Sequence, residues 1–519
     1  MIELFSELKY FRHNLFQNIP KKASCVLNLL DALCADGRRA KSIVELSTSK
    51  YFQRNYCSVT RAITDGLPSI DWSSSLSMVS RAGNSSTPYR RFVLDVTPLS
   101  RSHSLKLKDR SCVYSPNPTP GNKPITIGHQ YSVLAELPEG KGMERKNWVL
   151  PRSCERVSSS ANGSVLGMKQ MKEVQKQLEI EKQRILTIGD RAYGSKECLV
   201  EIDLETQVHL CRARNNRVVW GKFKQEDWDK KKRGGQQHYG KKMHLAKPET
   251  YLPAGGSSQF EYQTHSGKRI QVQAQYWESM LYRSSKKVEY VGHEHEFRLM
   301  KFQLLKESGE PLFSRPLWLI ALGDWREEVS IEEYFYHYQD RYDIEHFFRF
   351  GKNTLLLDKY QTCDVDHEEN WWRFVCLAYQ QLSLAKELVE DCPQDWEKYL
   401  PVYQESKSSL SSPSQTQRAF SKVLDQIGSP ARPPFKSKGG KGRQKGELQV
   451  KRKSQAVEWK TKPKLTVKNN SSRSSAKKSI SSNDEMNQKE LLDLLKQQIL
   501  NSKYSLEEIG LALLSSKKS

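Results

Sequence analysis

Apolar and polar positions alternate along the chain with two different periods, and the changes between them divide the sequence into regions. Up to about Thr87, short apolar sets recur at helical intervals, and strand-like runs begin only at Tyr89. From there to about Asn216, short apolar runs alternate with an amphipathic helical stretch, as in α/β proteins. We therefore predict an N-terminal helical domain over residues 1–88 and an α/β unit over residues 89–216.

The pattern changes again over residues 217–314, where strand-like pieces such as FEYQTHS and RIQVQAQYW lie among Gly, Gln, Lys and aromatic residues. We predict a β-rich insertion there. Residues 315–400 return to the α/β pattern, with the apolar run LWLIALG, a long helical stretch that begins at IEEYF, and an apolar helix around NWWRFVCLAY. The expected fold class is α/β, and residues 315–400 are expected to form the second part of its core.

The last part of the chain has the composition of a tail. From about Ser406 to Ser482 it is rich in Ser, Lys, Gly and Pro and poor in aromatic residues, so it offers too little apolar surface for a core of its own. We expect a basic, largely disordered linker over residues 401–484. Helical periodicity then returns, and a small helical tail is expected over residues 485–519.

The charge balance points to a polyanionic partner. The chain has 83 Lys and Arg against 60 Asp and Glu, a formal net charge of +23. Binding to phosphates releases their counterions, which makes nucleic acid the leading candidate. Part of the excess lies in the lysine-rich stretch after Phe435, so charge alone does not define a function.

Cysteine usage and hydropathy exclude several classes of protein. The ten cysteines are scattered without a C-x-x-C pair or a neighbouring His at metal-ligand spacing, which argues against a disulfide framework and a zinc module. No run approaches the roughly 18 apolar residues of a membrane span. We expect a cytoplasmic protein without a membrane partner.

Two aspartates stand at the ends of apolar runs. Asp95 follows the run FVL, and Asp190 follows ILTIG. In α/β sheets, binding clefts form at the carboxyl ends of the strands. An aspartate in that position is more often a turn former or a helix cap, so neither residue identifies a site by itself.

A third feature lies on the long helix after the insertion. Tyr338, Arg341, Glu345 and Lys352 have offsets of 0, 3, 7 and 14, which at about 100° per residue fall within an arc of roughly 60°. One helical face therefore carries an aromatic ring, two cations and a carboxylate. The alternative is a solvated face whose Arg341 and Glu345 form an ordinary i,i+4 ion pair.

These features together resemble a known family. The spacing Y-x2-R-x3-E-x6-K is similar to the YREK signature of the DDE transposases of bacterial insertion sequences, in the "insertion sequence four" supergroup. LDVTPLSRSH resembles that group's motif around its first aspartate, and TIGDRAYGS resembles the motif around its second. The three motifs stand in the family's order and span about half of the chain.

The resemblance implies a fold and a set of site residues. The fold would be a ribonuclease H-like catalytic core interrupted by the β-rich insertion. Asp95, Asp190 and Glu345 would be the catalytic residues and the ligands of two divalent ions, Mg²⁺ or Mn²⁺, since hard cations prefer carboxylate oxygens. Residues that would bind DNA are Tyr338, Arg341 and Lys352, with Arg349 and Tyr342 beside them and Trp318 stacking on a flipped base. The alternative for Trp318 is a core residue of a buried strand.

The function implied by the resemblance is cut-and-paste DNA transposition. Terminal inverted repeats would be cleaved by two protomers in a synaptic complex, through a DNA hairpin, and joined to target DNA. The partners would be double-stranded DNA and a second copy of the chain, in the bacterial cytoplasm at the nucleoid. Two alternatives remain: a catalytically silent DNA-binding protein derived from a transposase, and a ribonuclease H-like nuclease with other substrates.

Two further stretches are candidates for DNA contact. Residues 42–63 can be read as a helix, a turn and a second helix, which would make residues 1–88 a DNA-end-binding domain, although ordinary helical hairpins share this pattern. In the insertion, residues 230–235 (KKKRGG) lie near Trp220, Trp228 and Tyr239. Cations interleaved with aromatic rings suit a distorted or single-stranded DNA end, and a solvated loop is the alternative.

Overall fold

One mixed sheet runs through most of the part of the chain that is described by the computed structural model. That part comprises residues 2–79, 88–115, 124–138, 148–224, 238–264, 268–390, 412–435 and 451–459. Ten strands follow the order β2-β3-β1-β5-β6-β12-β11-β10-β7-β8, while β4 pairs with β3 and β9 pairs with β10.

The strand bounds are β1 (Arg90–Ser100), β2 (Ser111–Tyr114), β3 (Ile125–Glu136), β4 (Leu150–Val157), β5 (Ile185–Gly189), β6 (Gln207–Arg212), β7 (Val218–Lys222), β8 (Tyr239–His244), β9 (Gly256–Gln263), β10 (Arg269–Leu281), β11 (Phe297–Leu305) and β12 (Leu317–Leu322). The helix bounds are α1 (Ile2–Asn18), α2 (Ala23–Asp36), α3 (Cys57–Arg61), α4 (Trp72–Ser77), α5 (Gly163–Gln177), α6 (Lys196–Leu199), α7 (Ile331–Asp340), α8 (Tyr342–Thr354), α9 (Val365–Glu390) and α11 (Pro413–Ile427).

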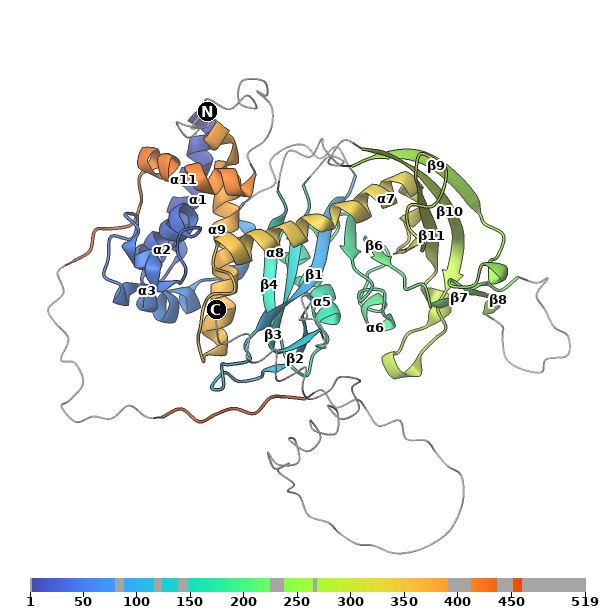
Figure 1. Ribbon diagram of the computed structural model, residues 1–519, viewed down its shortest axis with the longest axis horizontal. Coiled ribbons are helices and arrows are strands. Elements are labelled where there is room, and N and C mark those ends of the chain that lie inside the picture. The colour runs from blue at the N-terminus through green and yellow to red at the C-terminus, as the bar shows by residue number, and fades with distance from the viewer. Residues whose placement is uncertain are drawn as a thin grey trace, which may run out of the picture. The chain divides into compact units, whose positions relative to one another are not determined.

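The strand directions fit the expected core. β1, β5 and β6 are parallel to one another, whereas β3 and β12 join this group antiparallel from either side. Helices accompany the sheet, and α7 and α8 run across it in yellow in Figure 1. This mixed α/β arrangement fits the expected ribonuclease H-like core.

Each face of the sheet has its own apolar core, because side chains of a strand alternate between the two faces. In β1, Val93 belongs to the core shared with α8 and α9, while Phe92 and Leu94 belong to the core shared with α5. In β12, Leu319 lies in the first of these cores and Trp318 in the second. The alternation decides which side chains can reach the helix face that carries Glu345.

The strands of residues 217–314 continue the same sheet. β12 pairs with β11, β11 with β10, and β10 with β7 and β9, so these strands add directly to the α/β core. One face of β9, β10 and β11 packs on α7, where Phe260 and Phe302 contact Phe335 with ring centroids 5.6 and 5.3 Å apart. The expected strand content of this region is therefore present. Trp228 and residues 230–235 lie outside the described residues.

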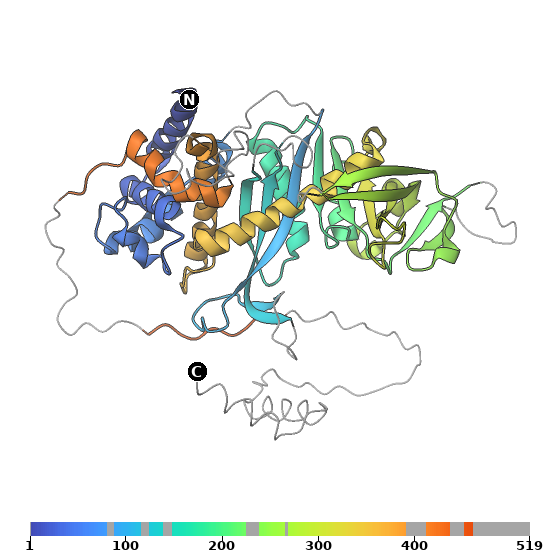
Figure 2. The ribbon, with the colours of Figure 1, turned by 45° about the horizontal axis from the view of Figure 1, so that its top comes forward.

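The N-terminal helices pack against α9 and α11. Arg12 of α1 forms a buried ion pair with Asp31 of α2. The same guanidinium donates to Gln381 Oε1 of α9 at 3.1 Å and to the carbonyl of Gly428, just after α11, at 3.3 Å. Figure 2 shows these blue and orange helices side by side. The beginning of the chain and residues 412–428 therefore share one core.

One sequence-based expectation about the tail was wrong. Residues 413–427, expected to lie in a disordered linker, form α11, which begins with a capping box of Ser412 and Gln415 and buries Phe420 and Val423. A composition average over the whole tail hides this amphipathic helix, whose apolar face is covered by α2 and α9. The remaining linker residues, apart from residues 428–435 and 451–459, and the expected helical tail over residues 485–519 lie outside the described residues.

Residues 42–63 form a 3-10 turn, Val44–Thr48, and then α3, which continues directly into a π-helical stretch, Ala62–Gly66. The interpretation of residues 42–63 as a DNA-binding helix, turn and helix stays a prediction. Among the described residues, no helix combines the length and the apolar character that crossing a bilayer requires.

Candidate active site

The first carboxylate of the candidate site comes from the middle of β1. Asp95 is two residues beyond Val93, so its side chain points to the same face of the sheet, toward α8. One carboxylate oxygen accepts the amide hydrogen of Val96 at 2.9 Å. Asp95 therefore lies within the strand, and its carboxylate faces the helix.

The second carboxylate comes from the neighbouring strand. β1 and β5 are parallel, with Val93 opposite Ile188, so Asp95 and Asp190 each lie two residues further along their chains. Asp190 directly follows β5, and its carboxylate accepts the amide hydrogen of Ala192 at 2.7 Å, which closes the turn after the strand. Parallel pairing thus brings the two aspartates to adjacent positions.

The third carboxylate comes from α8, next to the junction with α7. Arg341 separates the two helices but keeps right-handed helical dihedral angles, so the expected long helix continues through it with a local irregularity. Its guanidinium contacts Glu345 Oε1 at 2.7 Å and Asp95 Oδ2 at 3.7 Å. Arg341 therefore lies between the carboxylates of the strand and the helix.

Burial and nearby negative charges change the pKa of Asp95. Burial, together with the charges of Asp190 and Glu345, raises the pKa of Asp95 to about 7, although the charge of Arg341 and the hydrogen bond from the Val96 amide oppose the rise. A carboxyl group in this setting is ionised at a free-energy cost that a nearby cation would lower. Asp95 thus interacts electrostatically with Asp190, Glu345 and Arg341.

The donor set is compatible with a hard cation, although its arrangement here is not that of a metal centre. Among the described residues, no three His, Cys, Asp or Glu side chains are gathered closely enough to hold an ion. Arg341 supplies the positive charge between Asp95 and Glu345 instead. Three carboxylates are nevertheless the ligand type that Mg²⁺ and Mn²⁺ prefer, so the chemistry of the residues fits such ions.

The other residues of the helical stripe also meet β1. Lys352 donates to Thr97 Oγ1 at 2.8 Å and is 3.4 Å from the carbonyl oxygen of Pro98. Burial lowers the pKa of Lys352, against the opposing charges of Asp358 and Asp95. Tyr338, half-buried and two turns before Glu345, has its ring 5.9 Å from the Arg341 guanidinium. The stripe therefore lies along the strand that carries Asp95.

Arg349 and Tyr342 lie on the outer side of the same helix. The Tyr342 side chain is 44% exposed, and its hydroxyl accepts a hydrogen bond from Arg349 at 3.2 Å. These two groups remain open to a ligand from solvent, unlike Lys352, which is held against the sheet.

Trp318 is not a stacking surface in this structure. Its side chain is fully buried in the core on the α5 side of the sheet, opposite to the face of Asp95. The rings of Tyr251 and Trp277 cover it, with centroids 5.5 and 5.7 Å away. The structure thus favours the alternative, a core residue of a buried strand, because strand alternation turns the ring of Trp318 into the core.

The aromatic residues of the insertion are more accessible. Trp220 is half-buried, and the guanidinium of Arg283 lies 5.1 Å from its ring and 6.0 Å from the ring of Tyr239. Arg283, which the sequence motifs did not include, thus places a cation beside these two rings, whereas the expected cations of residues 230–235 lie outside the described residues.

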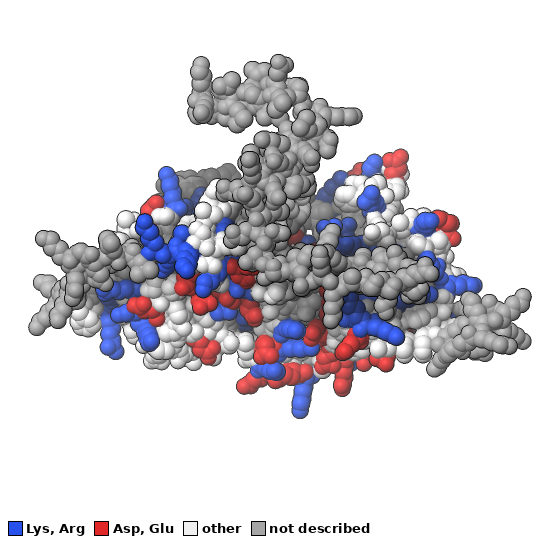
Figure 3. Space-filling view, turned by 90° about the horizontal axis from the view of Figure 1, so that it is seen from below, with Lys and Arg blue, Asp and Glu red and all other residues white. Residues whose placement is uncertain are grey.

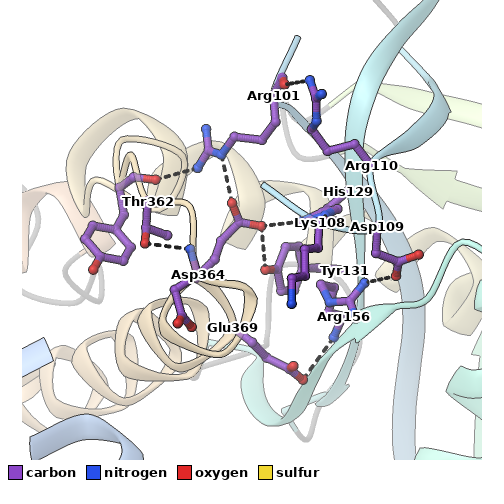
Figure 4. A network of polar contacts seen from close by, with 12 residues as sticks. Arg101, Lys108, Asp109, Arg110, His129, Tyr131, Arg156, Thr362, Asp364 and Glu369 are labelled. Atoms are coloured by element: carbon purple, nitrogen blue, oxygen red, sulfur yellow. Dashed lines mark hydrogen bonds and ion pairs between the residues drawn. The ribbon is translucent and has the colours of Figure 1, made fainter. Parts of the chain in front are cut away.

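A buried polar network that sequence reasoning missed holds the end of β1. Arg101, directly after β1, donates to Glu368 of α9 at 2.8 Å, and Glu368 also accepts from Tyr131 at 2.9 Å and contacts His129 at 2.6 Å. Figure 4 shows these groups converging from β1, β3 and α9. Arg101 also donates to the carbonyl of Tyr360 at 2.7 Å, so it ties β1 to the segment between α8 and α9. The network therefore fixes the strand of Asp95 relative to the helix of Glu345.

The comparison with protein families agrees with this geometry. Residues 157–380 match a family model described as the transposase DDE domain. The matched part includes Asp190 and Glu345, while Asp95 precedes it. No curated protein matches the chain. The family match supports a DDE transposase family and a transposase function that includes DNA as a partner.

Proposed function

We propose, from the match of residues 157–380 to the transposase DDE domain, that this protein cleaves and joins DNA with Asp95, Asp190 and Glu345 as its catalytic residues. The observation that carries the proposal is that Asp95 interacts electrostatically with Asp190 of the adjacent parallel strand and with Glu345 of α8, while Arg341 lies between Asp95 and Glu345. The three motifs that resemble the YREK group lie on these same elements, which supports membership of that group.

In this proposal the three carboxylates bind divalent ions, two Mg²⁺ or Mn²⁺ per site. Such ions supply Lewis acidity and neutralise developing charge during an in-line displacement at phosphorus. The raised pKa of Asp95 supports the assignment, because a site that disfavours its own ionised form is a typical functional site. Arg341 and Glu345 would exchange their mutual contact for contacts with substrate phosphate and cation.

The neighbouring residues would hold the DNA strand. Arg341 and Lys352 place positive charge beside the carboxylates, and Tyr338 lies next to Arg341. Arg349 and Tyr342, exposed on the outer side of α8, would contact the DNA that extends from the cleaved end. Charge-assisted contacts to phosphate position the strand without reading its sequence.

The wider reaction follows the resemblance. We propose cut-and-paste transposition at terminal inverted repeats, through a hairpin intermediate, by a homodimeric synaptic complex at the bacterial nucleoid. The hairpin step is supported by the family likeness alone, since Trp318 is buried in the core.

The proposal is tested on a supercoiled plasmid that carries the inverted repeats flanking the gene. Wild-type protein should nick it in the presence of Mg²⁺ or Mn²⁺. Nicking should fall by about 10³-fold or more in each of the variants Asp95→Asn, Asp190→Asn and Glu345→Gln. Each variant loses one carboxylate that would bind the metal ions, and these ions stabilise the negative charge of the transition state by several kcal/mol. Glu332→Gln, which alters an exposed carboxylate on α7, is the matched control and should nick normally.

Each alternative function has its own outcome. If wild-type protein binds the repeats but leaves the plasmid intact, it is a silent DNA-binding protein. Cleavage of any DNA without preference for the repeats would identify a nuclease. Normal nicking by all three carboxylate variants would remove the proposed site.

A further inference from the structure

A segment of the tail docks beside the loop that connects β1 and β2. The amide of Gln455 donates to the carbonyl of Leu105 at 2.8 Å, and the amide of Glu458 donates to the carbonyl of Arg110 at 2.7 Å. Ser111, the first residue of β2, forms a parallel bridge with Glu458. Residues 451–459, here called the docked tail segment, therefore lie as an extended strand at the sheet edge formed by β2. Figure 1 draws this segment in orange-red below β2.

The docking place is built by a buried arginine. Arg110 is 1% exposed and has one guanidinium nitrogen 3.4 Å from the carbonyl oxygen of Gln455. Its other nitrogen donates to the carbonyls of Arg101 and Ser102 at 3.1 and 3.2 Å. Arg101 continues into the network around Glu368, as Figure 4 shows. The contact is thus linked through two residues to the end of the strand that carries Asp95.

Docking gathers cations at one place. Lys451, Arg452 and Lys453 are exposed at the start of the docked tail segment. Next to them, Lys106 donates to the hydroxyl of Ser454 at 3.1 Å, and Lys108 is exposed on the same loop.

Within the described part of the chain, no carboxylate forms an ion pair with any of these five cations. The nearby carboxylate of Asp109 is paired with Arg156 instead. On the visible part of the lower face, Figure 3 shows basic and acidic side chains mixed.

We propose that the docked tail segment and the loop after β1 together form a binding surface for the phosphate backbone of duplex DNA. This inference rests on the proposed function, since it takes DNA as the polyanion that the five cations meet. The cations come from two distant parts of the sequence, so the surface exists only while the segment is docked. Bound DNA should in turn stabilise docking, because the coupling of two equilibria is reciprocal.

The test separates the charges from their placement, in the full-length protein. The triple variant K451Q/R452Q/K453Q removes three charges. Gln455→Pro keeps every charge but removes the amide that donates to Leu105. Ala456→Pro is the matched control, since among the described residues the Ala456 amide forms no hydrogen bond. Binding to a short random-sequence duplex is measured by fluorescence anisotropy at several NaCl concentrations.

The expected result is a change in salt dependence. The slope of log K against log[NaCl] should become shallower by up to about 2.7 in the triple variant, or about 0.9 for each phosphate that the protein no longer neutralises. Gln455→Pro should show a shallower slope as well, although its charge is unchanged, and Ala456→Pro should behave as wild type. Amide hydrogen exchange at Glu458 should slow when DNA is added to wild type but not to Gln455→Pro.

Two results would overturn the inference. A wild-type slope in Gln455→Pro, together with a reduced slope in the triple variant, would mean that the cations act from an undocked tail. A wild-type slope in both would mean that these cations do not contact DNA. Loss of plasmid nicking is a separate readout, so the proposed catalytic function can fail while this surface stands, and the reverse.

Discussion

Two glutamates and one aspartate show how the surroundings of a carboxyl group decide its role. Glu368 is completely buried among Arg101, His129 and Tyr131, and hydrogen bonding and charge from His129 and Arg101 lower its pKa against the effect of burial. Burial and like charges instead raise the pKa of Asp95. Glu345, with a partly exposed side chain, forms an ion pair with Arg341 at 2.7 Å. Glu368 is therefore held in its ionised form and stabilises the fold, whereas the surroundings of Asp95 disfavour its ionised form.

Glu368→Gln should destabilise the protein strongly at neutral pH. The change leaves Arg101 buried without its counter-charge, a loss of about 3–5 kcal/mol. Because folding lowers the pKa of Glu368 from its ordinary value of 4.5, the stabilisation is present above that value and disappears as the pH falls through the folded-state pKa. Urea midpoints of the wild type and Glu368→Gln should therefore converge below about pH 4.5.

Glu387→Gln is the control for this change, because its carboxylate lies on the same helix and is 45% exposed. It should alter the urea midpoint little at any pH. A gap between wild type and Glu368→Gln that stays constant from pH 7 to pH 3 would contradict the electrostatic explanation.

At the scale of elements, α7 and α8 connect the packing of the sheet to the chemistry. The capping box of Ser330 and Glu333 sets the start of α7. Phe335, Ile344 and Phe347 then bury one side of the helix pair against the first core. Since 3.6 residues make a turn, the opposite side presents to β1 the stripe of Tyr338, Arg341, Glu345 and Lys352. The packing of the apolar side of α7 and α8 therefore fixes the direction in which the polar stripe points.

The helix α11 should be an integral element. Phe420→Ala removes a completely buried ring where α11 packs on α2 and α9, so a loss of about 3–5 kcal/mol is expected. Ser414→Ala, at an exposed position on the same helix, should change stability by no more than about 0.5 kcal/mol. Thermal midpoints of both variants measure the difference, and equal midpoints would show that α11 does not pack as described.

On the scale of the whole molecule, the N-terminal helices, α9 and α11 pack into one core with the sheet. Leu8 and Leu15 of α1 are fully buried, and α1 packs chiefly on α9. Gln380 of α9 donates to the carbonyls of Leu76 and Pro151, which joins the N-terminal region to β4. Contacts of this kind bind distant parts of the sequence into a single core.

Residues 1–88 alone should therefore not fold stably. Their apolar faces are completed by α9 and α11, and the buried Arg12 loses Gln381 and Gly428 as acceptors in the fragment. Far-UV circular dichroism of the fragment should show no cooperative thermal transition, while the full chain shows one under the same conditions. A sharp transition in the fragment would establish an autonomous domain instead.

Local periodicity placed Asp190 after a strand and the stripe of Glu345 on one helical face, and the resemblance to a family linked both to Asp95. The expectation that a strand ends at Asp95 was wrong, because β1 continues to Ser100 through pairing with β3, which lies further along the chain. The side of the sheet on which Trp318 lies was decided by tertiary structure, since alternation gives two faces and only long-range packing shows which is covered. The same holds for α11 and the docked tail segment, whose polar composition conceals partners far away in the sequence. By itself the sequence determined the periods and the reactive groups. Tertiary structure determined which faces are buried and which charges meet, because both depend on contacts between residues hundreds of positions apart.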